Sequence, residues 1–268
     1  MMKKTFITLL IVCLLIAVVP KAGAVSMQVN GTTLTSGVMT FNSTTYVPLK
    51  TVSLLLRPDA RISWENNQAV VRTSNLTITA RPGNCYLQAN GRYLFAPYNI
   101  KLVNGTTMVP VRVLAKAMGA SVTWNSSTQK TVVSKGSGTI TSGANYYSSD
   151  KVYWLSRIIN AESSGESIRG KIAVGNVILN RVASPDFPNS IYGVIFDRTG
   201  GTQFTPVANG TIYNTPSAES IIAAKLCLDG ASVVSNSLFF LNPVTATSSW
   251  IANNRPYVAT IGNHVFYA

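Results

Sequence analysis

The chain has 268 residues, with 22 lysines and arginines, 9 aspartates and glutamates and 1 histidine, giving a formal net charge of +13. This length allows one large domain or two ordinary ones. A zinc amidase or metallopeptidase normally needs several His, Asp, Glu or Cys ligands at suitable spacing, and that pattern is absent. We therefore expect no metal site and no cofactor.

The first 24 residues have the pattern of a secretory signal peptide. Lys3 and Lys4 precede an apolar run from about Phe6 to Val19, and the small residues Ala22-Gly23-Ala24 follow it. A positively charged start, an apolar centre and an A-x-A ending are typical of a cleaved signal. The alternative is an uncleaved N-terminal anchor. We expect residues 1–24 to be removed and the remainder to act outside the cytoplasm.

Positive charge is concentrated in the first half of the chain. Residues 25–149 contain 11 basic and 2 acidic side chains, whereas residues 150–268 contain 8 basic and 7 acidic ones. A secreted polycation can bind anionic surfaces through counterion release. Outside a cell such a surface is a wall polymer or a membrane headgroup layer, so we expect one of these as a partner and no nucleic acid. The alternative is a surface that only keeps the protein soluble.

Residues 25–134 contain an internal repeat of about 60 residues. The segment "TTYVP" (Thr44–Pro48) aligns with "TTMVP" (Thr106–Pro110), and a tryptophan follows each segment, at Trp64 and Trp124. Each unit predicts strands joined by Asn-Gly turns, then a short helix, then a strand around the tryptophan. The helices are expected over Thr51–Leu56 and Val113–Met118. We expect both tryptophans in the core; the alternative is that they stack on carbohydrate.

This repeat resembles the copper amine oxidase N-terminal-like domain over roughly Met27 to Ser134. The resemblance implies a duplicated, β-rich stalk or surface-association domain. It does not imply copper, because copper(II) sites favour imidazole ligands and no histidine precedes His264.

A segment rich in Gly, Ser and Thr follows, "KGSGTITSGANYYSSD" (residues 135–150). It has no apolar period, so it predicts a flexible tether between two independently folded units, residues 25–134 and 151–268. After removal of the signal, Cys85 and Cys227 fall one in each unit, and no disulfide within a unit is expected.

The second unit is predicted to begin with a helix capped by Ser148, Ser149 or Asp150. Leu155, Ile158, Ile159 and Glu162 recur at spacings of three or four residues, so Glu162 lies on the apolar face of this helix. A carboxyl group on that face should lose hydration, which raises its pKa and favours the neutral acid. Ser163-Ser164-Gly165 then ends the helix.

The remaining elements of the second unit are mostly helical, with short strands near the C-terminus. The elements predicted are a helix over Ser167–Val182, a helix from Thr215-Pro216 to Gly230, aromatic loops at Phe187–Phe196 and Thr202–Tyr213, and strands within Ser237–Pro243 and Ile261–Ala268. The predicted fold class is therefore α+β: a duplicated β-rich α+β module, a flexible linker and a mostly helical domain with short strands.

Six blocks in this unit, in order, resemble the spore cortex-lytic enzyme family of cell-wall hydrolases. They are "INAESSGE", "GKIAVGNVILNRV", "FPNSIYGVIF", "QFTPV", "FLNPVTATSSW" and "IGNHVF". The resemblance implies a lysozyme-like fold, cleavage of the glycan strands of peptidoglycan, and Glu162 as the catalytic acid. It also implies a protein of the cell wall or spore envelope. Whether the substrate is cortex or vegetative wall is left open, as is any accessory or inhibitor protein.

Two mechanisms and one inactive role are compatible with these residues. We expect a lytic transglycosylase, which needs one carboxyl group that serves as acid and then as base. Ordinary glycoside hydrolysis needs a second carboxylate, for which Glu166, Asp186 and Asp197 are the candidates. The domain could instead bind wall without cleaving it. A Cys-His peptidase is disfavoured because Cys227 lies mid-helix between leucines.

Polar and aromatic residues within the apolar blocks are candidates for substrate contact. The transition state of glycoside cleavage needs polar partners, and sugar rings stack on aromatic side chains. His264 is more readily explained as a structural residue, with assistance to proton transfer as the alternative. The candidate substrate-binding residues are Gln203, Asn242, Ser248, Tyr192, Tyr213 and Trp250.

Overall fold

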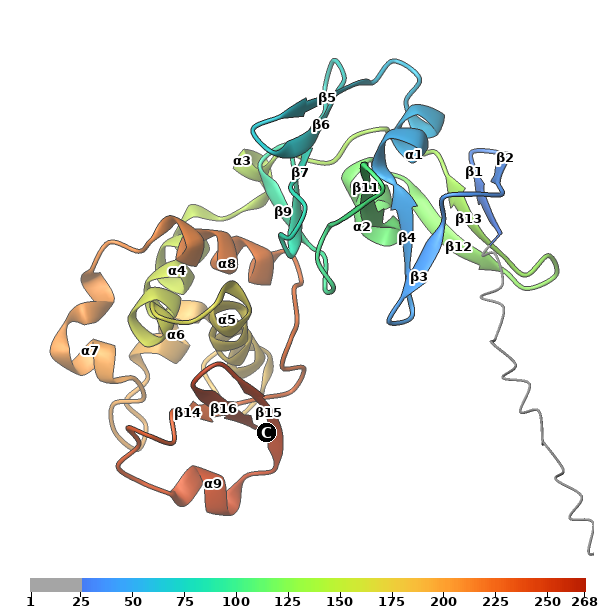
Figure 1. The fold of residues 1–268 in the computed structure, drawn as a ribbon. Helices are drawn as coiled ribbons and strands as arrows, with labels where there is room; N and C mark the ends of the chain where they lie inside the picture. Colours follow the sequence, from blue (N-terminus) through green and yellow to red (C-terminus); the bar gives the residue numbers. More distant parts are fainter. Residues whose placement is uncertain (1–25) are drawn as a thin grey trace, which may run out of the picture.

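A computed structural model describes residues 26–268 of the protein (Figure 1). The predicted signal peptide, residues 1–24, lies outside the described residues. A β-rich module is followed by a mostly helical domain, as expected for an α+β chain. Within residues 26–268, no helix has the length and apolar character needed to cross a membrane.

The repeat forms the centre of the β-rich module. Its two Thr-Thr-x-Val-Pro segments become strands β4 and β11, which pair antiparallel with Val47 opposite Val109. The sheet order is β10-β11-β4-β3, with bounds β10 (Lys101–Val103), β11 (Thr106–Pro110), β4 (Thr44–Pro48) and β3 (Met39–Phe41). Helices α1 (Leu49–Leu56) and α2 (Val111–Ala117) follow these strands directly, and each starts two residues earlier than predicted.

Two further sheets complete the module. One has the order β12-β13-β1-β2, with bounds β12 (Ser121–Asn125), β13 (Lys130–Ser134), β1 (Met27–Val29) and β2 (Thr32–Leu34). The other is an antiparallel meander of β5 (Arg61–Glu65), β6 (Gln68–Arg72), β7 (Thr77–Ala80), β8 (Tyr86–Ala89) and β9 (Arg92–Phe95). Strand β1 pairs parallel with β13, so the two ends of the module meet in one sheet. The apolar faces of all three sheets and both helices enclose one core.

The prediction that both tryptophans lie in this core was wrong. Trp64 is 52% exposed and Trp124 is 56% exposed. Each lies on an edge strand, β5 or β12, of its sheet. The valines of the neighbouring strands β6 and β13 fill the core instead, with Val70, Val71 and Val133 almost fully buried.

The segment predicted as a free tether packs against the β-rich module. The backbone N–H of Gly143 donates to the carbonyl of Asn90 (2.7 Å), and Arg57 donates to the carbonyl of Gly138 (2.8 Å). A Cβ at Gly143 would lie 2.4 Å from the carbonyl oxygen of Gly91. Glycine at this position allows the two backbones to come into close contact. A Gly-rich composition is equally typical of a mobile chain, so composition alone does not distinguish a packed segment from a tether. A short helix, α3 (Gly143–Tyr146), forms within the segment.

Three packed helices form the core of the second domain: α4 (Ser149–Ser163), α5 (Ile168–Ala183) and α8 (Ala218–Leu228). Ser148, Ser167 and Ser217 cap them through their hydroxyl oxygens. Helix α8 therefore begins after Ser217, not at the predicted Thr215-Pro216. Gly175 of α5 permits the close packing, because a Cβ there would lie 2.7 Å from the Sγ of Cys227 on α8.

Shorter elements surround these helices. The two aromatic segments predicted as loops contain α6 (Ile191–Phe196), α7 (Thr205–Asn209) and the 3-10 helix η1 (Thr211–Tyr213). Helix α9 (Trp250–Asn254) precedes the final hairpin. The sheet has the order β14-β16-β15, with bounds β14 (Phe239–Leu241), β16 (His264–Tyr267) and β15 (Tyr257–Ile261).

The two domains are docked through Asp229, which follows α8. Arg92 of β9 donates to both carboxylate oxygens of Asp229, each at 2.8 Å, and Lys116 of α2 donates at 2.6 Å. Tyr147 donates to the same carboxylate at 3.1 Å. Burial would raise the pKa of Asp229, but the hydrogen bonds from Arg92 and Lys116 hold it below its usual value. The carboxylate is thus a shared anchor for both domains and the connecting segment.

Candidate active site

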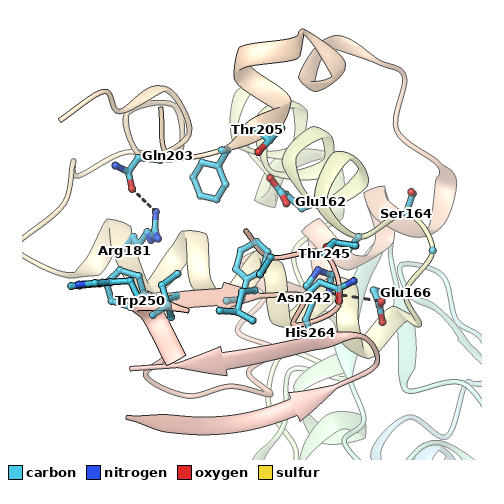
Figure 2. Close-up of a pocket in the computed structure, with 18 residues that line it drawn as sticks. Glu162, Ser164, Glu166, Arg181, Gln203, Thr205, Asn242, Thr245, Trp250 and His264 are labelled. Atoms are coloured by element: carbon cyan, nitrogen blue, oxygen red, sulfur yellow. Dashed lines mark hydrogen bonds and ion pairs between the residues drawn. The ribbon is translucent and has the colours of Figure 1, made fainter. Parts of the chain in front are cut away.

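A cavity of about 680 Å³ opens on the helical domain (Figure 2). Several segments form its walls. They include the end of helix α4 with the turn that follows it, and residues 203–205, which lead into α7. The others are β14 with the loop that follows it, helix α9, and the start of β16. These segments are distant in sequence, so only the tertiary fold brings them together.

Glu162 lies in the wall of this cavity, at the last turn of α4. Leu155, Ile158 and Ile159 occupy the preceding positions on the same helix face and are fully buried. Glu162 continues that face to the point where the core gives way to the cavity. Burial raises the pKa of Glu162 to about 7, and no cation or hydrogen-bond donor among residues 26–268 offsets this effect. The group is therefore suited to hold a proton near neutral pH.

The turn after Glu162 is held in place by a buried lysine. Lys171 of α5 is 2% exposed and donates to the backbone carbonyls of Ser164 and Glu166. Its ammonium also pairs with Glu219 at 2.8 Å. Ser163 donates its hydroxyl to the carbonyl of Ile159 at 2.6 Å, so this hydroxyl is engaged within the helix. These contacts fix the end of α4 and therefore the position of Glu162.

Glu166, one of the predicted second carboxylates, also lines the cavity but is committed to the final hairpin. Its carboxylate accepts from the backbone N–H of Asn263 (3.3 Å) and from the Asn263 side-chain amide (2.8 Å). Gly262 allows this contact, because a Cβ there would lie 1.7 Å from Oε2 of Glu166. These bonds tie the turn after α4 to the β15–β16 turn. Asp186 and Asp197, the other candidates, do not line the cavity.

His264 lies beside Glu166 in the cavity wall. Its Nδ1 is 3.8 Å from Oε1 of Glu166, and that nitrogen has no hydrogen-bond partner among residues 26–268. Burial lowers the pKa of His264, although the Glu166 carboxylate opposes this change. The imidazole of His264 is therefore neutral in this environment. Its ring packs against Phe240, with 5.4 Å between the ring centroids.

The structure gathers three of the six predicted substrate-binding residues. Gln203, Asn242 and Trp250 line the cavity, and Trp250 is 54% exposed. Tyr192, Tyr213 and Ser248 do not line it. The two tyrosines pack around Trp154 of α4 instead, and Ser248 accepts from the backbone N–H of Trp250.

Arg181 is a lining residue that the sequence analysis did not select. It lies in the last turn of α5 and donates to the backbone carbonyl of Leu238. Its guanidinium also faces the side chain of Gln203 (Figure 2). A single arginine near a helix end gives no sequence signal of burial. Phe204, Phe239 and Phe240 also line the cavity. The sequence marked them as members of apolar segments and not as site residues.

A second hollow of about 430 Å³ shares Glu162, Ser164 and Thr205 with the first cavity. Asn160, Asn209, Thr211 and Asn214 contribute polar side chains to its lining. Glu162 is thus flanked by two hollows, an arrangement that suits a long substrate with its reacting bond in the middle.

No cluster of three or more His, Cys, Asp or Glu side chains within residues 26–268 could hold a metal ion. Cys85 and Cys227 are both free and buried, and burial raises the pKa of each thiol. A nucleophilic role for Cys227 would need the opposite change in pKa.

Comparison with known proteins assigns each domain separately. The family model described as cell wall hydrolase matches residues 165–267, and the copper amine oxidase N-terminal domain model matches residues 28–141. The first match begins three residues after Glu162 and so does not reach it. The donors present in residues 28–141 do not fit a copper site, because this stretch has no histidine and no metal-ligating cluster occurs within residues 26–268.

Several relatives share the second domain. A spore cortex-lytic enzyme of Bacillus cereus is 42% identical over 122 residues, covering 46% of this chain and 46% of the relative. The cell wall hydrolase CwlJ of Oceanobacillus iheyensis is 31% identical over 125 residues, covering 44% of this chain and 86% of the relative. The solved catalytic domain of the germination-specific lytic transglycosylase SleB from Bacillus anthracis is 41% identical, with a TM-score of 0.42, covering 46% of this chain and 98% of that structure.

The chain belongs to the cell wall hydrolase family. Its relatives include the spore cortex-lytic enzymes, although the match spans only 35–46% of the length of those curated relatives.

Proposed function

We propose that the protein is a secreted enzyme that cleaves the glycan strands of peptidoglycan as a lytic transglycosylase. The observation that carries this proposal is Glu162: a protonatable carboxyl group without a partner among residues 26–268, placed between two hollows. Relatives named spore cortex-lytic enzyme and germination-specific lytic transglycosylase support the choice of substrate and reaction. We assign the activity to residues 151–268 and place the protein at the cell wall or spore envelope.

The reaction can run with this one carboxyl group. Glu162 donates its proton to the oxygen between N-acetylmuramic acid and N-acetylglucosamine as the bond from the anomeric carbon to that oxygen breaks. The resulting carboxylate then accepts the proton of the muramyl C6 hydroxyl, whose oxygen bonds to the anomeric carbon. The products are a 1,6-anhydromuramyl end and a free glucosamine end. Glu162 regains its proton, and no water is consumed.

Hydrolysis by the same cavity is the second candidate, because Glu166 also lines it. A base must be free to accept a proton from water, and an inverting pair of carboxyl groups must leave room for that water. The Glu166 carboxylate is occupied by Asn263 on the β15–β16 turn. This engagement favours transglycosylation over hydrolysis.

The products distinguish the two reactions. The full-length secreted protein should release muropeptides with anhydromuramyl ends from purified sacculi, and mass spectrometry should find them 18 mass units lighter than the hydrolysis products by the loss of one water. Reducing muramyl ends as the main product would contradict transglycosylation. Parallel digests of spore cortex and vegetative sacculi would establish which wall is the preferred substrate.

The elevated pKa of Glu162 predicts a specific pH profile. Because the acid form starts the reaction, kcat/KM should be constant below about pH 7 and fall with increasing pH above it. The same pKa affects folding: the folded carboxyl holds its proton between about pH 4.5 and 7, where the unfolded one has released it. The free energy of unfolding of the wild type should therefore decrease across that window relative to Glu162→Gln. An activity that stays flat up to pH 9 would contradict this assignment.

A further inference from the structure

Arg181 places a buried guanidinium in the wall of the cavity that contains Glu162. The residue is 6% exposed. Its Nε donates to the backbone carbonyl of Leu238 at 2.7 Å, and its Nη1 faces Oε1 of Gln203 at the long distance of 3.5 Å. Figure 2 shows Arg181, Gln203 and Trp250 on one side of the cavity, Glu166 and His264 on the other, and Glu162 between them.

The surroundings of this cation are otherwise apolar. The rings of Phe187, Phe204 and Phe239 lie 4.9, 5.2 and 5.4 Å from the guanidinium carbon. Within residues 26–268, no carboxylate lies within salt-bridge distance of it. Burial lowers the pKa of Arg181 to about 10, and Asp197 opposes this only through a longer-range attraction.

The other two buried lysine or arginine side chains among residues 26–268 are each paired with a carboxylate. Arg92, whose side chain is 8% exposed, has both carboxylate oxygens of Asp229, and Lys171 has Glu219. Burying a cation without an anion is costly, because the lost hydration is not replaced. Arg181 keeps its unmatched charge in the wall of the cavity, where a bound ligand can supply the counter-charge.

We propose that Arg181 binds a carboxylate group of the substrate. This inference rests on the proposed function and deepens it. Muramic acid carries a lactyl carboxyl group, which is free when no peptide is attached, and an attached peptide contributes carboxylates of its own. A guanidinium binds a carboxylate through a planar pair of charge-assisted hydrogen bonds, and the aromatic walls keep that pair away from water. The contact fixes how the strand lies across Glu162, so it acts on substrate affinity and orientation.

The test compares the KM and kcat of the wild type with those of Arg181→Gln on three soluble glycan substrates. The first is strands that carry peptides, and the second is strands freed of peptides by an amidase. The third is peptide-free strands whose lactyl carboxyl groups have been converted to primary amides. Loss of a hydrogen bond to a charged group should raise KM by roughly 10- to 100-fold on the carboxylate substrate that Arg181 binds, with a smaller change in kcat. On the amidated strands the two proteins should have similar KM values.

The pattern across substrates identifies the source of the carboxylate. A defect on peptide-free strands that disappears on amidation assigns the lactyl carboxyl, whereas a defect confined to peptide-bearing strands assigns a peptide carboxylate. An equal effect on all three substrates would overturn the proposal and leave Arg181 as a scaffold residue. Arg198→Gln, which removes an exposed arginine without a side-chain hydrogen bond among residues 26–268, is the matched control for lost charge.

A measurement on the wild type alone keeps the proposal testable if Arg181→Gln does not fold. Amidation of every carboxyl group on the substrate should raise the wild-type KM by the same roughly 10- to 100-fold. An unchanged KM would overturn the proposal even though cleavage itself continued. Failure of the wild type to cleave any of the substrates would instead count against the proposed function.

Discussion

Replacing Glu162 with glutamine is expected to lower the rate of glycan cleavage by about 100- to 10,000-fold, the usual contribution of a positioned general acid. Glutamine has nearly the same shape as protonated glutamate but has no transferable proton. Because Glu162 has no hydrogen-bond partner among residues 26–268, the substitution breaks no hydrogen bond within the described structure. Substrate binding should therefore be largely retained while kcat decreases, as release of soluble muropeptides from sacculi would show.

Asp186→Asn provides the control for this experiment. Asp186 is exposed in the loop after α5 and lines neither hollow, so its neutralisation should leave the rate unchanged. If Glu162→Gln cleaved sacculi as fast as the wild type, the acid would have to be another residue. If both proteins bound sacculi and neither cleaved them, the domain would be a wall-binding module without activity.

Replacing Asp229 with alanine is expected to cost about 3–5 kcal/mol in the free energy that holds the two domains together, the usual loss when one partner of a buried ion pair is removed. The variant leaves Arg92 buried without its anion and removes an acceptor from Lys116 and Tyr147. These three residues belong to the β-rich module and the connecting segment, so the loss falls on the junction between domains.

Urea denaturation followed by circular dichroism should therefore begin at lower urea for Asp229→Ala, and small-angle scattering should detect a more extended molecule before either domain unfolds. The pair of Glu65 and Arg72, whose side chains are 40% and 49% exposed, offers the comparison. Since water already solvates Glu65, its replacement with alanine should change stability little. Identical unfolding and scattering for Asp229→Ala and the wild type would show that other contacts hold the domains together.

Local patterns predicted the position of Glu162 well. Its spacing from Leu155, Ile158 and Ile159 depends only on the helical period, and the helix cap at Ser148 was among the three residues proposed. The repeat was equally visible in the sequence, since both Thr-Thr-x-Val-Pro segments form strands. That these two strands pair with each other could not be predicted, because pairing depends on how the whole module closes.

Features that depend on distant segments were missed or could not be placed from the sequence. Arg181 acquires its environment from Leu238 and Gln203, which lie 57 and 22 residues away. Tyr192 and Tyr213 were chosen for their stacking chemistry; the structure packs them against Trp154 and outside the cavity lining, and their contact with substrate stays a prediction. The amino-acid composition of residues 135–150 likewise could not distinguish a mobile tether from a packed segment. Gly143, for example, lies against the backbone of Gly91.

The docking of the connecting segment determines the reach of the enzyme. With residues 135–150 held against the β-rich module and Asp229 clamped by its partners, the cleft stays at a constant distance from that module. A molecule attached to the wall at one point could then cut only those bonds that its cleft already faces. If the β-rich module binds the wall, each new cut would require the module to detach and rebind, and the rate of wall degradation would depend on the dissociation rate of the module.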